Sequence, residues 1–375
     1  MDFSSEFEVL RPYNNSEVEP AIARIIKHPY LKGVLTYLYP GQDINLVISK
    51  FKEIKTVDEF QAFFSHHAVR HVVETTSKGL TFSGLDELDK TTPYLFIANH
   101  HDIVLDSAIM QVLLLENGHR TSQITFGSNL MSDEIIIDLG KLNKMFTFYR
   151  GGSRMETYKN AVLHSAYIRN VITEKKESIW IAQRDGRTKN GDDRTQSGLI
   201  KMLLAGRKDY HAALKELNIV PVCITYEYVP CDILKARETY LAESGEYTKQ
   251  AGEDFNSILT GITGYKGHVN MTFGKPINSI MNTIDPNIGL NDLADLVVES
   301  IDQEMHKNYK LWAGNYIALD ILQENTTYLG SKYSETEKAE FLKYIDKKLS
   351  KIADNNLGIR TKLIEMYAKP VLNTL

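Results

Sequence analysis

The spacing of apolar residues divides the chain into three zones. In "EPAIARIIKHPYLKGVLTYLY" and "VDEFQAFFSHHAVRHVVETTSKG", apolar residues recur three and four positions apart, and both segments end near a glycine. This periodicity is typical of amphipathic helices. The same helical spacing returns from residue 289 to the end of the chain. We therefore predict a helical N-terminal unit at residues 1–80 and a helical C-terminal segment at residues 286–375.

The middle zone, residues 81–285, has a different pattern, in which short apolar runs alternate with amphipathic segments. The predicted strands are residues 94–99, 123–128, 146–150, 178–183, 219–228 and 268–274. Strands that alternate with helices form a sheet covered by helices. We therefore predict an α/β fold with a mixed central sheet, flanked by helical N-terminal and C-terminal segments.

Composition and charge exclude some classes of protein. A formal net charge of −5 provides no basic footprint for nucleic acid. The two cysteines, Cys223 and Cys231, have no metal-finger spacing, which favours a reducing compartment. The start of the chain is acidic where a signal peptide would be basic, and no apolar run approaches the ~18 residues of a membrane span. We therefore expect a cytoplasmic protein whose membrane contact is peripheral.

Polar clusters follow three of the predicted strands, at residues 99–106 ("NHHDIVLD"), 150–154 ("RGGSR") and 184–194 ("RDGRTKNGDDR"). Ligands of open α/β sheets bind at the carboxyl ends of the strands. In the first cluster, two histidines would lie in a turn and Asp106 just inside the following helix. A carboxylate bonded to one imidazole nitrogen leaves the other free to take a proton from a hydroxyl. The alternative is that these residues, with the capping types Asn99 and Asp102, only cap the helix.

The other two clusters are basic although the whole chain is acidic. They contain Arg150, Arg154, Arg184, Arg187, Lys189 and Arg194. Guanidinium groups bind phosphate in a bidentate manner, so a phosphate-bearing substrate is favoured over the alternative of a solvated charged loop. The stretch "DGRTKNGDD" lacks the pattern of a calcium loop and is predicted to be a solvated turn. His67 and His71 have a zinc-compatible spacing without a third ligand, so we predict a helix surface or a packed interface there and no metal.

In this order and spacing, the clusters resemble those of the glycerolipid acyltransferase family, which includes glycerol-3-phosphate and 1-acylglycerol-3-phosphate acyltransferases. The resemblance spans about residues 80–280, and "NHxDIVLD" looks like a bacterial sub-group. The matching positions are Asn99 and His100 with Asp106, a strand ending at Arg150, the Asp185, Gly186 and Arg187 block, and a strand containing Pro221.

Two departures from the family pattern affect the assignment. The usual four residues between histidine and aspartate select His101, whereas the Asn-His pair selects His100, with five residues before Asp106. We favour His100 and place His101 as a neighbour near the phosphate. Asp185 stands where the family has glutamate, and Arg187 follows the glycine directly. The family's phosphate-contacting positions therefore correspond less closely to residues of this chain than its histidine and aspartate do.

The resemblance implies a mechanism and a site. His100, oriented by Asp106, would deprotonate an acceptor hydroxyl that attacks the thioester of acyl-CoA or acyl carrier protein, with no metal or other cofactor. Backbone amides near Gly186 would help stabilise the oxyanion. The implied substrate-binding residues are Asn99, His101, Arg150, Arg154, Arg184, Asp185, Gly186 and Arg187.

The implied acceptor is 1-acyl-sn-glycerol 3-phosphate or glycerol 3-phosphate, used in phospholipid synthesis at the inner face of the membrane. The implied partners are the acyl donor, a phosphate-bearing lipid and a membrane surface, without nucleic acid. Two alternatives stay open, because basic loops indicate an anion without identifying it. One is an acyltransferase for another acceptor, such as an amino-acid lipid, and the other is a non-catalytic lipid-binding protein.

Overall fold

The computed structural model describes residues 3–131, 133–352 and 357–375. Within them, seven strands form one sheet in the order β1-β7-β6-β2-β5-β3-β4. The strands are β1 (Ser77–Ser83), β2 (Leu95–Ala98), β3 (Gln123–Gly127), β4 (Met145–Phe148), β5 (Ile179–Ala182), β6 (Ile219–Tyr226) and β7 (Gly267–Phe273). Neighbouring strands are parallel, except that β6 and β7 are antiparallel. The predicted α/β fold with a mixed sheet is confirmed.

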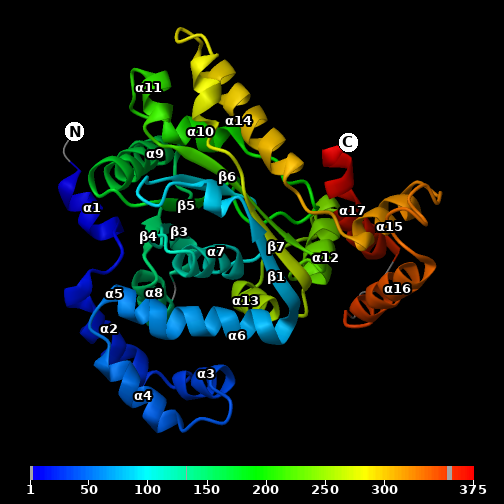
Figure 1. The fold of residues 1–375 in the computed structure, drawn as a ribbon, viewed down its shortest axis with the longest axis horizontal. Helices are drawn as coiled ribbons and strands as arrows, with labels where there is room; N and C mark the ends of the chain where they lie inside the picture. The colour runs from blue at the N-terminus through cyan, green and yellow to red at the C-terminus, as the bar shows by residue number, and fades with distance from the viewer. Residues whose placement is uncertain (1–2, 132, 353–356) are drawn as a thin grey trace.

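Helices cover both faces of this sheet (Figure 1). On one face, α6 (His66–Thr76) and α7 (Leu105–Glu116) pack on β2, β6 and β7. On the other face lie α9 (Arg154–Arg169), α10 (Ser197–Leu203), α11 (Tyr210–Lys215) and α14 (Leu290–Lys307). The strands β2 and β6 are buried along their whole length, as expected for central strands whose two faces are both covered.

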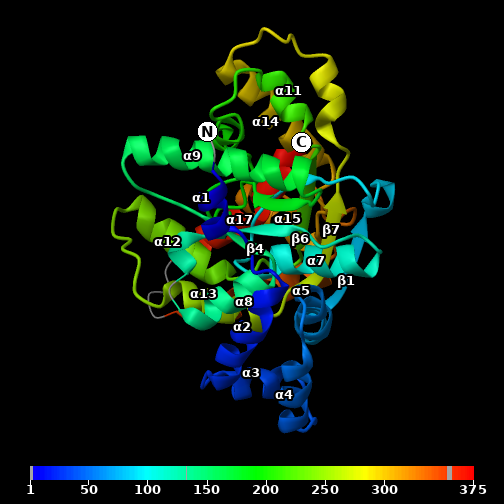
Figure 2. The ribbon, with the colours of Figure 1, turned by 90° about the vertical axis from the view of Figure 1, so that its left-hand side faces the viewer.

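The first helices of the chain form a separate apolar cluster at one end of the molecule (Figure 2). They are α2 (Asn15–Lys27), α3 (Leu31–Leu38), α4 (Ile44–Glu53) and α5 (Val57–Phe60), followed by a π-helical turn at Gln61–Ser65. The preceding helix, α1 (Ser4–Leu10), packs instead in the core shared with α9. α2 joins this cluster to α8 (Glu134–Leu142), where Arg24 donates two hydrogen bonds to the buried carboxylate of Asp138. The helical character predicted for the N-terminal unit is confirmed up to Thr76.

The last part of the chain is also helical, as predicted. α15 (Ala313–Leu322), α16 (Glu335–Leu349) and α17 (Leu357–Thr374) pack against α12 (Asp232–Glu243). The buried carboxylate of Asp232 accepts hydrogen bonds from the hydroxyls of Tyr344 and Tyr367 and from the amine of Lys348, which ties these helices together. The α-helix α13 (Glu253–Thr263) lies beside α6 in Figure 1.

The six predicted strands are confirmed to within two residues at each end, but β1 was not predicted. The helical pattern was expected to continue to Gly79, whereas α6 ends at Thr76 and Ser77 begins an edge strand paired with β7. Most residues of β1 are exposed, so the segment lacks the alternation of apolar and polar residues that reveals a half-buried strand. The division of the chain at residues 80 and 285 stays a prediction. None of the described helices combines the length and apolarity needed to cross a bilayer.

Candidate active site

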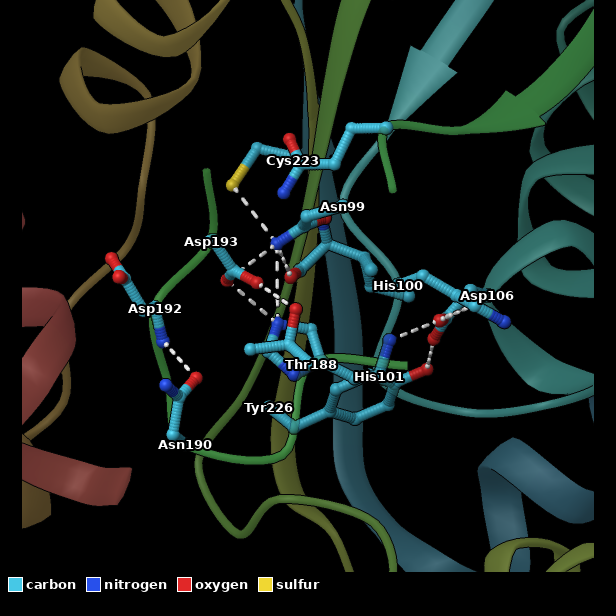
Figure 3. Close-up of polar contacts among 12 residues, drawn as sticks. Asn99, His100, His101, Asp106, Thr188, Asn190, Asp192, Asp193, Cys223 and Tyr226 are labelled. Carbon is cyan, nitrogen blue, oxygen red and sulfur yellow. Dashed lines mark hydrogen bonds and ion pairs between the residues drawn. The ribbon is translucent and has the colours of Figure 1, made fainter. Parts of the chain in front are cut away.

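The turn between β2 and α7 holds a histidine against a carboxylate (Figure 3). Nδ1 of His100 lies 2.9 Å from Oδ2 of Asp106, which sits in the first turn of α7. Because a carboxylate only accepts hydrogen bonds, we assign the proton to Nδ1, which leaves Nε2 unprotonated in the neutral ring. The His100 side chain is 14% exposed, whereas Asp106 is buried. The structure thus places His100, and not His101, in side-chain contact with Asp106.

Four donors converge on the Asp106 carboxylate. Besides His100, it accepts from the backbone amides of His101 (2.6 Å) and Asp102 (2.8 Å) and from the hydroxyl of Tyr226 on β6 (2.7 Å). Burial by itself raises the pKa of Asp106, but the hydrogen bond and charge of His100, with the charge of His101, outweigh it and hold the pKa below its usual value. The carboxylate is therefore ionised and fixed in orientation.

The sequence around this turn explains its shape. Oδ1 of Asp102 accepts hydrogen bonds from the amides of Val104 and Leu105, so it caps α7 as its residue type suggests. Asn99 has another role, because its side chain donates to the carbonyl of Ile224 and accepts from the same residue's amide. Asn99 thereby fastens the end of β2 to β6.

His101 points into the protein interior, where it meets a different carboxylate. Its Nε2 lies 2.9 Å from Oδ2 of Asp193, and the Asn99 amide donates to the same oxygen at 3.1 Å. The Thr188 hydroxyl donates to Oδ1 of Asp193 at 2.6 Å. His101 and Asn99 are buried, and Nδ1 of His101 has no hydrogen-bond partner among the described residues. Their assignment to substrate binding stays a prediction that no contact in the structure supports.

The segment predicted to be a solvated turn is partly buried, so that prediction is wrong for Thr188, Gly191 and Asp193. Thr188 and Asp193 are each 1% exposed. The Thr188 amide also donates to the carbonyl of His100 at 2.7 Å, which joins this loop to the turn between β2 and α7. Turn-forming and acidic residue types favour a surface loop, and nothing in "NGDDR" distinguishes the buried Asp193 from its neighbour Asp192.

The predicted basic loops after β4 and β5 contact each other through an ion pair. Nη1 of Arg150, just after β4, forms an ion pair of 2.7 Å with Asp185, just after β5. Nη2 of Arg187 donates to the Ser257 hydroxyl on α13, and its Nη1 is buried with no hydrogen-bond partner among the described residues. Gly186 has a φ of 72°, a left-handed conformation that suits glycine in the turn between Asp185 and Arg187.

Two cavities adjoin these loops. One, of about 400 Å³, is lined by Arg184, Asp185, Gly186, Arg187 and Lys189 together with residues of α12. The other, of about 580 Å³, lies between α9 and α10 and is lined by Arg154, so Arg154 lines a different cavity from Arg184 and Arg187. His100 lines neither of these two cavities.

His67 takes part in helix packing. Its Nε2 lies 2.7 Å from the carbonyl oxygen of Leu38, and its ring stacks on Tyr39. Within the described ranges, no three His, Cys, Asp or Glu side chains gather in a way that could hold a metal ion.

Comparison with solved structures shows a distant likeness. No family model matches the chain. No curated protein matches it either. Among solved structures, it is similar to the 1-acyl-sn-glycerophosphate (LPA) acyltransferase PlsC from Thermotoga maritima, with 14% identity over 77% of this chain and 95% of that chain and a TM-score of 0.34. At that TM-score and identity, the likeness establishes neither a shared function nor a shared site.

Proposed function

We propose that this chain is an acyltransferase that moves a fatty acyl group from a thioester donor, acyl-CoA or acyl carrier protein, to a hydroxyl of 1-acyl-sn-glycerol 3-phosphate or glycerol 3-phosphate. The observation that carries this proposal is the contact of 2.9 Å between Nδ1 of His100 and Asp106. It leaves Nε2 available as a base on a partly exposed side chain at the carboxyl end of a central strand.

In the proposed reaction, Nε2 of His100 takes the proton of the acceptor hydroxyl while its oxygen attacks the thioester carbonyl. The Asp106 carboxylate stabilises the imidazolium that forms. Collapse of the tetrahedral intermediate breaks the carbon–sulfur bond, and the leaving thiolate takes the proton back from His100. A thioester is already activated toward attack, so we propose no cofactor.

The cavity beside the β5 loop supports a phosphate-bearing acceptor. Arg184, Arg187 and Lys189 line it, and Nη1 of Arg187 lacks a hydrogen-bond partner within the described part of the chain. An unpartnered buried guanidinium nitrogen is costly, and a phosphate oxygen would satisfy it. We therefore propose that Arg187 holds the acceptor phosphate, assisted by Arg184.

We expect Arg187→Ala to raise the KM for the phosphate-bearing acceptor by roughly tenfold to a hundredfold, because a charge-assisted hydrogen bond contributes about 1.5–3 kcal/mol. The KM for the acyl donor should stay unchanged. Initial rates at varied acceptor concentration measure this effect. Arg120→Ala is the matched control, since Arg120 is exposed and pairs with Glu177 away from the site. Equal acceptor KM values for the two variants would contradict the role of Arg187.

Mass spectrometry of reaction products tests the function itself. The purified protein is given acyl-CoA or acyl carrier protein donors with glycerol 3-phosphate, 1-acyl-sn-glycerol 3-phosphate or an amino-acid lipid as acceptor. We expect acylation of a phosphate-bearing acceptor. Lipid binding without any acylated product would instead support the non-catalytic lipid-binding protein.

One observation favours the alternative acceptor. Arg150 is paired with Asp185, and Lys189 is paired with Glu238, so two cations near the cavity are already neutralised. An acceptor with less negative charge than a phosphate monoester, such as an amino-acid lipid, would suit this balance. Competition between the acceptors in one reaction distinguishes the two cases.

We further propose that the protein works in the cytoplasm and binds the inner face of the membrane peripherally. α3 supports this proposal, because Leu31, Leu35 and Leu38 are buried while Val34 and Tyr37 of the same helix are exposed. Tyr30, just before the helix, is 67% exposed. Apolar side chains exposed on one helix at the end of a molecule can insert into a lipid surface.

We expect the triple substitution Tyr30→Ser, Val34→Ser, Tyr37→Ser to lower binding to vesicles of phosphatidylethanolamine and phosphatidylglycerol by roughly tenfold or more, because the buried apolar area is lost. Co-sedimentation measures the bound fraction. The control replaces Leu115, Leu296 and Leu322, which are exposed on three different helices, by serine. If both triple variants bind as the wild type does, α3 is not the membrane-binding surface.

A further inference from the structure

A second histidine–aspartate pair lies beside the first and is completely enclosed. His101 and Asp193 are both buried, and their contact of 2.9 Å joins residues 92 positions apart. Because the Asp193 carboxylate only accepts, Nε2 of His101 carries the proton. Asn99 and Thr188 supply the other two hydrogen bonds to Asp193. The carboxylate therefore joins the strand exit of β2 to the loop that follows β5 (Figure 3).

A buried carboxylate is retained only where hydrogen bonds and opposite charge offset its desolvation. Burial raises the pKa of Asp193, but His101, Thr188 and Asn99 together outweigh it and hold the pKa below its usual value. The Asp193 carboxylate is thus ionised, and its hydrogen bonds connect separate segments of the chain inside the protein. It touches neither of the two cavities, so a direct contact with substrate does not explain it.

The same loop is held from its outer side by the C-terminal helices. Nε2 of His306, on α14, lies 3.2 Å from the Asp193 carbonyl oxygen, and Asp302 accepts from the Thr195 amide at 2.9 Å. Gly191 has a φ of 76°, and a Cβ there would lie 2.2 Å from the Met366 carbonyl oxygen on α17. The loop is therefore clamped between α14 and α17 on one side and the turn between β2 and α7 on the other.

We propose that His101 and Asp193 form a positioning pair that holds the loop bearing Arg187 against the turn bearing His100. The link is short, because Thr188 follows Arg187 directly and contacts both Asp193, through its hydroxyl, and the His100 carbonyl, through its amide. The pair sets the distance between the proposed base and the proposed phosphate-binding arginine. The kinetic part of this inference rests on the proposed function, whereas the structural part does not.

Asp193→Asn tests the pair, with Asp192→Asn as the matched control. Asp192 is the adjacent residue, and its side chain pairs with the exposed Arg194. We expect Asp193→Asn to raise the acceptor KM about tenfold and to lower kcat, while the donor KM stays unchanged. A variant that is merely less stable would lose active enzyme and therefore kcat, with an unaltered acceptor KM. That result, or equal kinetics for the two variants, would overturn the proposal.

Limited trypsin digestion of the folded protein supplies a readout that needs no activity. The loop contains four cleavage residues, Arg184, Arg187, Lys189 and Arg194. We expect cleavage after Arg187 and Lys189, mapped by mass spectrometry, to be about tenfold faster in Asp193→Asn than in wild type or Asp192→Asn. If the wild type transfers no acyl group but this difference appears, the proposed function fails and the positioning pair stands. If cleavage is equal in all three proteins, the positioning pair fails.

A conservative replacement of His101 keeps the proposal testable if Asp193→Asn does not fold. The amide nitrogen of glutamine can occupy the place of Nε2 and donate to Asp193. We expect His101→Gln to retain the wild-type acceptor KM and trypsin resistance to within about threefold, and His101→Ala to lose both. If folded His101→Gln behaves as His101→Ala does, the hydrogen bond to Asp193 does not position the loop.

Discussion

Replacing His100 by alanine is expected to lower kcat by about 10²- to 10⁴-fold, the usual loss when a general base is removed. The physical reason is that Nε2 of His100 is the proposed proton acceptor and Asp106 already occupies Nδ1. The KM values should change little, because His100 is proposed to act on the proton and not to hold the phosphate. Steady-state acyl transfer at saturating donor and acceptor measures the effect.

Two controls accompany His100→Ala. His71→Ala removes a histidine of α6 whose ring contacts Tyr37 and His67, so kcat should stay at the wild-type level. Added imidazole should restore part of the activity of His100→Ala, since a free base can enter the space left by the side chain. Wild-type turnover by His100→Ala would remove His100 from the mechanism.

Asp106→Asn is expected to have the second largest effect, a loss of about 10²- to 10⁴-fold in kcat. The asparagine oxygen, in the place of Oδ2, can still accept from Nδ1 of His100 and from the amides of His101 and Asp102. Its NH₂ group then takes the place of Oδ1 and faces the Tyr226 hydroxyl. The neutral side chain lacks the negative charge that stabilises the imidazolium formed when Nε2 of His100 takes the proton, so proton transfer becomes less favourable. Kinetics at saturating substrate show the loss.

Asp138→Asn is the matched control for Asp106→Asn. Asp138 is also a buried carboxylate, but it is bonded to Arg24 and Tyr13 at the N-terminal helices. The Asp138→Asn variant should be less stable than the wild type and should keep the wild-type kcat.

The folded-state pKa of Asp106 is lowered, so the contribution of this carboxylate to stability is complete above its unfolded pKa of about 3.9 and is lost as pH falls through the folded value. Acid unfolding should therefore depend less on pH in Asp106→Asn, and an unchanged profile together with wild-type kcat would contradict the assignment.

The sequence predicted the features of this molecule that depend on local pattern. Apolar runs such as residues 94–99 and 178–183 reveal central strands, because both faces of these strands are buried. The contact between His100 and Asp106 is also local, since a turn and the first turn of one helix bring them together. The edge strand β1 has no such pattern, because most of its side chains are exposed.

The features that were missed depend on contacts between distant parts of the chain. Asp193 is buried because the turn containing His101 covers it on one side, and α14 contacts its backbone on the other. Tyr226 reaches Asp106 only because β6 lies beside β2 in the sheet. Spacing along one sequence cannot reveal such pairings. For the same reason it could not show that Arg150 is paired with Asp185, or that Arg154 lines a different cavity.

The most direct test of the central claim is acceptor-dependent release of free thiol from an acyl thioester donor, measured together with the acylated product in wild type and His100→Ala. The account predicts that wild-type protein releases thiol only when the acceptor is present, with one acylated product formed for each thiol, and that His100→Ala abolishes both. Thiol release without acceptor would indicate a hydrolase. Release of neither thiol nor product by wild type would contradict acyl transfer altogether.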